Sequence, residues 1–257
     1  MDYILIGLFA LFGSALTLFS GFGLGTILLP IFGLFFPIEI AVIMTSIVHL
    51  ANNLLKIVLF GKNASKITVL YFGIPAIIFA FIGAYCLTLL SNLNPLFTYR
   101  LFTLKIEISY VKATIGLLLI IFSLVEYLAK YKNLAFNKKY LPLGGVLSGF
   151  FGGLSGHQGA LRSAFLIKIG LSKNSFIATG VLIACLVDLS RLSIYIPKIS
   201  TLHNSLNFKL IIFATIAAFA GVYIGNKLLE KVTIQFVQNC VAFLLFTYGI
   251  LLIIGLL

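Results

Sequence analysis

The amino-acid sequence predicts an all-α polytopic membrane protein made of two inverted repeats, each a V-shaped broken helix followed by three transmembrane helices. Three observations predict this fold class. The composition is 61% hydrophobic and 9% charged, apolar segments of spanning length follow one another, and two glycine-rich breaks recur at corresponding places in the two halves. Because soluble domains carry about 25% charged residues, a chain of this composition must expose apolar surface to lipid.

Six apolar segments are long enough to cross a bilayer as one helix. A hydrocarbon core about 30 Å thick requires roughly 20 helical residues, and each segment exceeds this length. They are continuous rather than alternating in polarity, which excludes a transmembrane barrel. The predicted spans are Ile38–Phe60, Ile67–Leu90, Ile106–Leu128, Ser175–Ile196, Leu206–Leu229 and Ile234–Leu257.

Two further segments, Tyr3–Pro37 and Leu141–Leu171, are too long for one span and too short for two. Each is interrupted by glycines in its middle. The first interruption reads "SGFGLGTILLP" at 20–30, and the second reads "GGLSGHQGALRSA" at 152–164. Because glycine costs about 1 kcal/mol relative to alanine inside a helix, both segments are predicted to be broken helices.

The two halves of the chain match each other in an ordered series. A basic linker, "AKYKNLAFNKKY" at 129–140, separates a first repeat at 1–128 from a second at 141–257 within one integral membrane domain. A slowly growing offset between matches is what changes in loop length between duplicated halves produce. The matches are Gly25 with Gly159, Thr45 with Thr179, Asn53-x-x-Lys56 with Asp188-x-x-Arg191, and "AFIGAY" at 80–85 with "AFAGVY" at 218–223.

The distribution of lysine and arginine favours broken helices that return to the side they entered. With that V shape, ten loop cations fall on one side and four on the other, namely Arg100, Lys105, Lys198 and Lys209. A single crossing of each broken segment gives eight against six. Because positive loops face the cytoplasm, the net charge of +12 is assigned to cytoplasmic loops rather than to nucleic-acid binding. The protein is then a multi-pass cell-membrane protein with both termini outside.

The glycine breaks are candidate substrate-binding elements. Inverted repeats with discontinuous helices place a substrate site near the bilayer midplane, and glycine lets a ligand approach the backbone. Half-helices starting after Gly25 and Gly159 would point free N–H groups and their positive dipole ends at an anion. Close helix packing is the alternative role for these glycines. The candidate glycines are Gly21, Gly23, Gly25, Gly156 and Gly159.

Polar residues inside the apolar segments are the other candidates, because burying them in lipid is expensive unless they face a pore or pair with one another. In the second break, Arg162 is expected to neutralise substrate charge, Gln158 to contact the substrate, and His157 to donate a hydrogen bond, carry a coupling proton or serve structure alone. Arg191 is expected to act like Arg162, or to form a structural ion pair with Asp188 on the same helix face.

A polar stripe along the first predicted span provides secondary candidates. Its members are Ser46, His49, Asn53 and Lys56, which follow helical spacing. Lys56 lies near the end of the span and could instead extend to the membrane interface. A metal or cofactor is not expected, because the sequence has no HExxH, no paired cysteines and no carboxylate cluster; Cys86, Cys185 and Cys240 are isolated packing residues.

The sequence resembles the sulfite exporter TauE/SafE family. The resemblance is carried by "GFGLGTILLPIFGL" followed by "MTS" in the first half, and by "GFFGGLSGHQGALRSAFLIKIGLSKNSFIATG" in the second. It implies a permease for sulfur-containing anions such as sulfite, sulfonates or thiosulfate. The chain departs from the family pattern at Ala164, where the family usually has proline, although Pro30 is retained. His157, Gln158 and Arg162 also make the second break more polar than is usual.

We therefore expect a secondary transporter for a small sulfur oxyanion or organosulfonate that works by alternating access. A coupling proton or sodium ion, membrane lipid and a homo-oligomeric state are the expected partners. A passive anion channel is one alternative. An intramembrane enzyme is another, for which Ser155 and His157 are the nearest approach to a nucleophile–base pair. No GxxxxGK[ST] motif is present in the sequence, so ATP coupling would require a partner.

Overall fold

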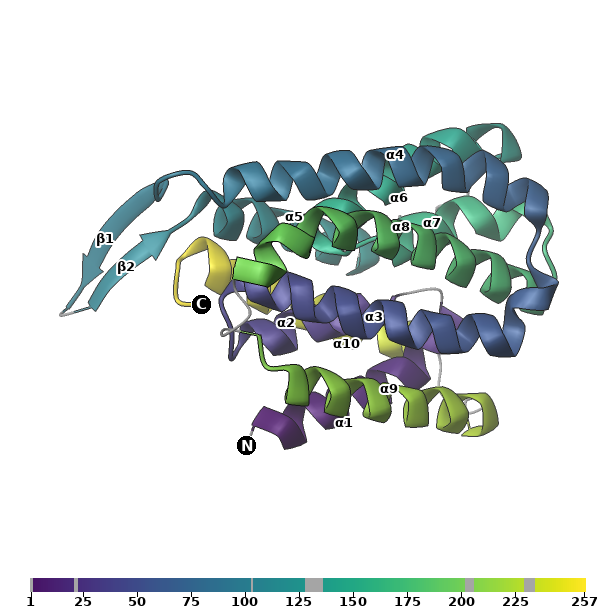
Figure 1. Ribbon diagram of the computed structural model, residues 1–257, viewed down its shortest axis with the longest axis horizontal. Helices are drawn as coiled ribbons and strands as arrows, with labels where there is room; N and C mark the ends of the chain where they lie inside the picture. Colours follow the sequence, from purple (N-terminus) through teal and green to yellow (C-terminus); the bar gives the residue numbers. More distant parts are fainter. Residues whose placement is uncertain (1, 21–22, 103, 128–135, 202–205, 229–233) are drawn as a thin grey trace.

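The computed structural model describes residues 2–20, 23–102, 104–127, 136–201, 206–228 and 234–257 as a bundle of helices with one β-hairpin (Figure 1). The hairpin projects from the left end of the bundle in Figure 1, and both chain termini lie at that end. The turn at Gly61–Asn63 lies at the opposite end. The two ends of the chain therefore share one end of the bundle.

The helices divide between the two halves of the chain. The first half contains α1 (Asp2–Ser20), α2 (Leu24–Gly33), α3 (Ile38–Phe60), η1 (Gly61–Asn63), α4 (Lys66–Leu90) and α5 (Tyr110–Tyr127). The second half contains η2 (Lys138–Tyr140), α6 (Leu141–Ser155), α7 (Gly159–Leu166), η3 (Ile167–Ile169), α8 (Lys173–Thr201), α9 (Phe208–Leu228) and α10 (Ile234–Ile253). In each half, two helices separated by a break are followed by three further helices.

Four helices of the described chain are long and apolar enough to cross a membrane. They are Ile38–Asn63, Lys66–Leu90, Lys173–Pro197 and Phe208–Gly225, which agrees with four of the six predicted spans. Shorter apolar stretches occupy Asp2–Leu18, Leu24–Gly33, Tyr110–Val125 and Asn239–Ile253. The last helix ends at Ile253 rather than at the predicted Leu257, and Gly255 follows it with φ +73°. The prediction of a polytopic helical membrane protein is confirmed.

The predicted span Ile106–Leu128 is wrong at its first residues, which belong to a β-hairpin. Strand β1 (Phe97–Leu101) pairs antiparallel with β2 (Leu104–Ile108), so that Ile106 lies opposite Tyr99, and α5 begins at Tyr110. Polarity alternates along both strands, as period-two alternation in a half-buried strand requires. The hairpin was missed because its apolar residues continue into those of α5.

The two faces of the hairpin have different environments. On the apolar face, Ile106 is buried, and the Tyr99 hydroxyl donates a hydrogen bond to the Ile254 carbonyl after α10. On the polar face, Lys105 Nζ lies 2.6 Å from Glu107 Oε1, and the hydrogen bond from Lys105 holds the pKa of the Glu107 carboxyl below its ordinary value. The hairpin thus contacts the residues that follow α10 at the C-terminus.

Two helix pairs pack so closely that backbone meets backbone. Helix α6 packs on α4 near the top of Figure 1, and α9 packs on α1 near the bottom. Three glycines of α6, one helical turn apart, each face a backbone carbonyl of α4. Gly145 faces Phe72, Gly149 faces Ala76 and Gly153 faces Ala80. Small residues are what allow such close approach between membrane helices. Close packing is therefore the role of these α6 glycines.

Helix α2 shows how the fold accommodates a broken helix. Each of its ten residues is buried, including Pro30 inside the helix. Irregular backbone at membrane depth is tolerated where protein covers it, and α1, α3 and α10 all contact α2. The first break is therefore held inside the bundle rather than against lipid.

Gly83 and Gly221, which match each other in the two repeats, make a testable pair. A Cβ at Gly83 of α4 would collide with the Phe150 carbonyl of α6, and a Cβ at Gly221 of α9 would collide with the Leu11 carbonyl of α1. Because backbone cannot move aside easily, Gly83→Ala and Gly221→Ala are each expected to destabilise the protein by about 1–3 kcal/mol. The measurement is the midpoint of thermal unfolding in detergent.

Gly73→Ala is the matched control on α4. A Cβ there would lie 3.3 Å from the end of the flexible Leu186 side chain and in ordinary contact with Val69 at 3.6 Å. Its unfolding midpoint should stay close to that of the wild type. Equal midpoints for all three variants would mean that these helix pairs tolerate separation and that the close contacts do not stabilise the bundle.

Candidate functional site

The two breaks in the helices lie where the glycine clusters are. The first falls between α1 and α2, and Gly21 lies outside the described residues. Helix α2 begins at Leu24, one residue before Gly25, so the predicted start after Gly25 is slightly late. The second break separates α6 from α7, which begins at Gly159. Gly156 ends α6 with φ +83°, a left-handed conformation that favours glycine.

A pocket of about 30 Å³ lies where the first break meets the second half of the chain. Its wall is formed by the end of α1, Gly23 and Leu24 at the first break, the polar stripe of α3, one face of α7 and the first turns of α8. Leu24 starts α2, so its backbone N–H at this wall has no acceptor within the helix. Both halves of the chain therefore contribute to one pocket.

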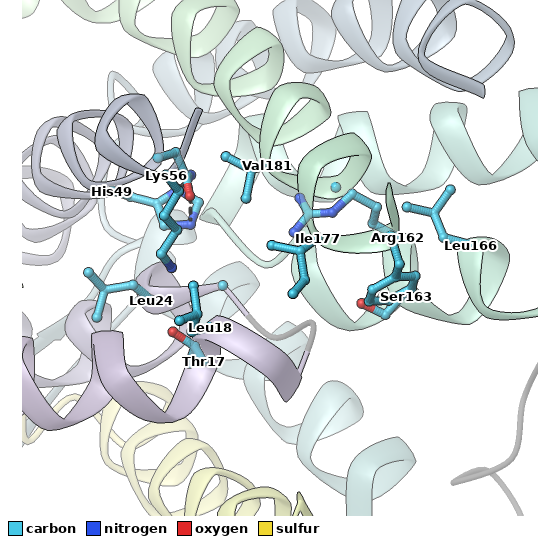
Figure 2. Close-up of a pocket in the computed structure, with 14 residues that line it drawn as sticks. Thr17, Leu18, Leu24, His49, Lys56, Arg162, Ser163, Leu166, Ile177 and Val181 are labelled. Carbon is cyan, nitrogen blue, oxygen red and sulfur yellow. Dashed lines mark hydrogen bonds between the residues drawn. The ribbon is translucent and has the colours of Figure 1, made fainter. Parts of the chain in front are cut away.

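Two cations reach this pocket from opposite walls. Figure 2 shows Arg162 of α7 reaching in from one side of the pocket and Lys56 of α3 lying on the other, where its side chain runs toward Leu24. Lys56 is 4% exposed and Arg162 is 6% exposed. Arg162 Nη1 donates a hydrogen bond to Gln158 Oε1 at 3.1 Å, whereas Lys56 has no hydrogen-bond or ion-pair partner among the described residues. No acidic residue belongs to the described wall.

The nearest carboxylate, Asp188, lies behind the wall and is fully engaged. Its Oδ1 accepts hydrogen bonds from Arg191 Nη2 at 2.7 Å and from Gln158 Nε2 at 3.2 Å. Its Oδ2 accepts from His49 Nδ1 at 2.6 Å and from Asn53 Nδ2 at 3.4 Å. Asp188 is fully buried, and its two oxygen atoms contact these four donors rather than Lys56 or Arg162.

The predicted site residues divide between the pocket wall and the network behind it. Those in the wall are Gly23, His49, Asn53, Lys56 and Arg162. Gly25 packs against Thr45 and His49. Gly156, His157, Gln158, Gly159, Asp188 and Arg191 do not line the pocket. Within that second group, Gln158 and Asp188 connect two wall residues by hydrogen bonds. Arg162 bonds to Gln158, Gln158 bonds to Asp188, and Asp188 bonds to His49.

Arg191 is held by the network rather than exposed to the pocket. It is fully buried, and besides Asp188 its Nη1 donates to the Gly152 carbonyl at 3.4 Å. A Cβ at Gly156 would come within 2.7 Å of that Nη1. The absence of a side chain at Gly156 therefore makes room for Arg191, in addition to permitting the left-handed turn.

His157 also lies away from the pocket. Its ring stacks on Phe122, with centroids 5.8 Å apart and an interplanar angle of 10°. Nδ1 lies 3.2 Å from both the carbonyl and the hydroxyl oxygen of Ser155, and the Ser155 hydroxyl itself donates to the Phe151 carbonyl at 3.1 Å. The pair is buried, and within the part of the chain that the structure describes His157 Nε2 has no hydrogen-bond partner that would orient the ring as a base.

Sequence reasoning missed much of the apolar and small-residue wall. These residues are Thr17, Leu18, Leu24, Ser163, Leu166, Phe176, Ile177, Gly180 and Val181. Gly180 carried a usable signal, because it follows Thr179, the repeat partner of Thr45, and a Cβ there would lie 3.3 Å from Arg162 Nε. The apolar members carried none, since they resemble every other lipid-facing or packed residue of the spans.

The family model described as Sulfite exporter TauE/SafE matches residues 4–252 of the chain. The match covers both breaks and every helix around the pocket, and it confirms the resemblance read from the two glycine-rich motifs. The chain has no significant match among curated proteins or among solved structures.

Proposed function

The chain belongs to the sulfite exporter TauE/SafE family of membrane transporters, and on this premise we propose that it is a secondary transporter that moves a small sulfur oxyanion across the cell membrane by alternating access. The observation that carries the proposal is the surplus of positive charge around the pocket. Lys56 and Arg162 face a shared space without an acidic residue in its described wall. A buried cation without a partner is costly, and a bound anion removes that cost.

The chemistry of the wall suits an oxyanion. The planar guanidinium of Arg162 offers several donors that match the oxygen atoms of a sulfur oxyanion, while Lys56 acts as a compact point charge. Their attraction for an anion is stronger here than in water, because burial lowers the local dielectric constant. Gly23 and Leu24 add backbone N–H groups at the start of α2. Main chain from the first repeat and side chains from both repeats would then hold one anion.

The size of the pocket favours inorganic oxyanions over larger organosulfonates. A volume of about 30 Å³ holds roughly two water molecules, so the space suits a small ion better than a larger one. An organosulfonate would require the α7 and α8 walls to move apart. We therefore propose sulfite or thiosulfate as the preferred class, with organosulfonates as weaker substrates.

Several features support the inverted repeat and alternating access. If α1–α5 correspond in order to α6–α10, then α1 corresponds to α6 and α4 to α9, so the close pair α4–α6 corresponds to the close pair α1–α9. Gly83 and Gly221 occupy matching positions in these two pairs. Lys56 and Arg191, which match in sequence, differ in environment: one faces a pocket, and the other is sealed by Asp188. One accessible and one sealed half is the asymmetry that a two-state transporter requires.

We also propose how the protein is oriented in the membrane. Both termini lie at the hairpin end of the bundle (Figure 1), so they share a side if the bundle crosses the membrane along its long axis. We propose that this side is external and that the basic linker is cytoplasmic, as the distribution of lysine and arginine favours. Lys56 lies on the half of α3 farther from the hairpin, so the pocket is proposed to face the cytoplasm.

Flux into proteoliposomes tests the function directly. Radiolabelled sulfite and thiosulfate are expected to enter vesicles containing the purified protein with saturable kinetics, and labelled ethanesulfonate, an organosulfonate anion, should enter more slowly. Saturation separates a transporter from a passive channel, which would give ohmic currents. Absence of flux for all three anions, in vesicles with correctly inserted protein, would contradict the proposal.

A further inference from the structure

We infer that His49 binds a proton at Nε2 together with the transported anion, so that each ligand strengthens the binding of the other. This inference rests on the proposed function, because it concerns the same pocket. It shifts the proton role expected of His157 in the second break to a histidine in the first repeat. His49 suits this role by its position, by its second ring nitrogen and by the charges around it.

The position of His49 suits a residue that senses the pocket. It is the central residue of α3, it belongs to the pocket wall, and it is 1% exposed. Its Nδ1 contact with Asp188 Oδ2, at 2.6 Å, joins α3 of the first repeat to α8 of the second. A change at this ring therefore acts on the wall and on a contact between the repeats at once.

The second ring nitrogen is available for a proton. Because Nδ1 donates to Asp188, the neutral ring has Nε2 as an acceptor. Asn53 Nδ2 lies 3.3 Å away from Nε2, and a Cβ at Gly23 would lie 3.0 Å from the same atom. Bare backbone at Gly23 thus leaves Nε2 clear at the wall. When Nε2 takes a proton from water, the Asn53 amide can turn to offer its oxygen.

The surrounding charges explain why the proton and the anion favour each other. The charged groups that act on His49 are Asp188 and Arg191 of α8 and Lys56 of its own helix. Asp188 is already balanced by Arg191. A proton on His49 then adds a positive charge close to Lys56, which repels it while the pocket holds no anion. A bound anion turns that repulsion into attraction.

Other groups packed nearby do not supply this proton site. Arg162 of α7 stays charged, and Cys185 of α8, which lies within electrostatic range of Lys56 and Arg162, is outside the pocket wall. The described residues of α2, α5 and α9 contribute no charge that acts on His49. His157 faces Ser155 and Phe122 and is likewise outside the wall.

The test measures proton uptake during anion binding to the purified full-length protein. Thiosulfate, sulfate and methanesulfonate are suitable probes, because none of them titrates near neutral pH. In a weakly buffered solution with an indicator dye, the wild-type protein is expected to take up protons when an anion binds. Reciprocal linkage also requires the apparent Kd to fall as the pH is lowered, by at most about tenfold per pH unit for one proton.

Two histidine variants locate the proton. His49→Gln should bind the anion without proton uptake and with a Kd independent of pH, whereas His157→Gln should take up protons as the wild type does. Both variants are compared only if they elute as the wild type does on size exclusion. Unchanged uptake in His49→Gln overturns the inference and points to Lys56.

The wild-type measurement separates this inference from the proposed function. Anion binding without proton uptake across the pH range would refute the proton site while the anion transporter stands. If none of the three anions binds and none is transported, the proposed function fails, and the proton inference fails with it.

Discussion

Replacing Arg162 with glutamine is expected to weaken anion binding by about tenfold to a hundredfold. Hydrogen bonds to charged groups contribute roughly 1.5–3 kcal/mol, and each 1.4 kcal/mol is about a factor of ten in Kd. Arg162 is buried in the pocket wall and has no acidic partner there. Lys56→Gln should have a similar effect, because Lys56 carries the other charge that faces the same space.

Binding is measured by calorimetry with thiosulfate, and transport by the initial rate of uptake into proteoliposomes. Arg162→Lys separates charge from geometry: it keeps the positive charge but loses the planar fork of donors, so its affinity should lie between those of the wild type and Arg162→Gln. Lys62→Gln is the matched control, because Lys62 is exposed in η1, just beyond α3.

Wild-type affinity in both Arg162→Gln and Lys56→Gln would remove the pocket from the mechanism, because no other cation belongs to its described wall except His49 when protonated. A loss in Arg162→Gln alone would assign the anion to the α7 side. A comparable loss in Lys62→Gln would show that the effect comes from net charge at the membrane surface rather than from the pocket.

The fold was predictable because lipid imposes simple constraints on a chain. Spanning length and apolar composition were enough to find the helices at 38–60 and 66–90, since in a bilayer every backbone group must be satisfied within the helix. The breaks were predictable because glycine clusters such as Gly23–Gly25 weaken a helix inside a segment that is otherwise apolar. The hairpin at 97–108 was missed because alternation over five-residue strands is a weaker signal than an apolar run.

The candidate site was predictable in its residue types but not in its pairing. Charged residues inside apolar spans are few, so Arg162, Lys56 and Asp188 stand out in the sequence. Which cation faces the pocket and which is neutralised depends on how α3, α7 and α8 pack, and sequence spacing does not contain that information. The i, i+3 spacing of Asp188 and Arg191 allowed an ion pair, but the cross-repeat contact from His49 required the tertiary fold.

Asp188→Asn is expected to destabilise the protein strongly, by about 3–5 kcal/mol. Asparagine keeps the shape of the side chain but removes the charge that balances Arg191, whose guanidinium is fully buried and 2.7 Å from Asp188. The change also converts one carboxylate oxygen into an amide donor, which then faces a donor of His49, Asn53, Gln158 or Arg191. The measurement is the midpoint of thermal unfolding in detergent, with the wild type alongside.

Glu107→Gln is the matched control for Asp188→Asn, because it removes a carboxylate from an ion pair of nearly the same length. Lys105 and Glu107 are 2.6 Å apart but lie on the exposed face of the hairpin, where such a pair contributes about 0–1 kcal/mol. Because the two ion pairs have nearly the same length, the difference between their unfolding midpoints reports the effect of burial. The double variant Asp188→Asn/Arg191→Met should recover much of the loss, since methionine leaves no unbalanced charge. Equal midpoints for Asp188→Asn and Glu107→Gln would mean that the Asp188 network does not hold the two repeats together, and that Arg191 finds another neutralising partner.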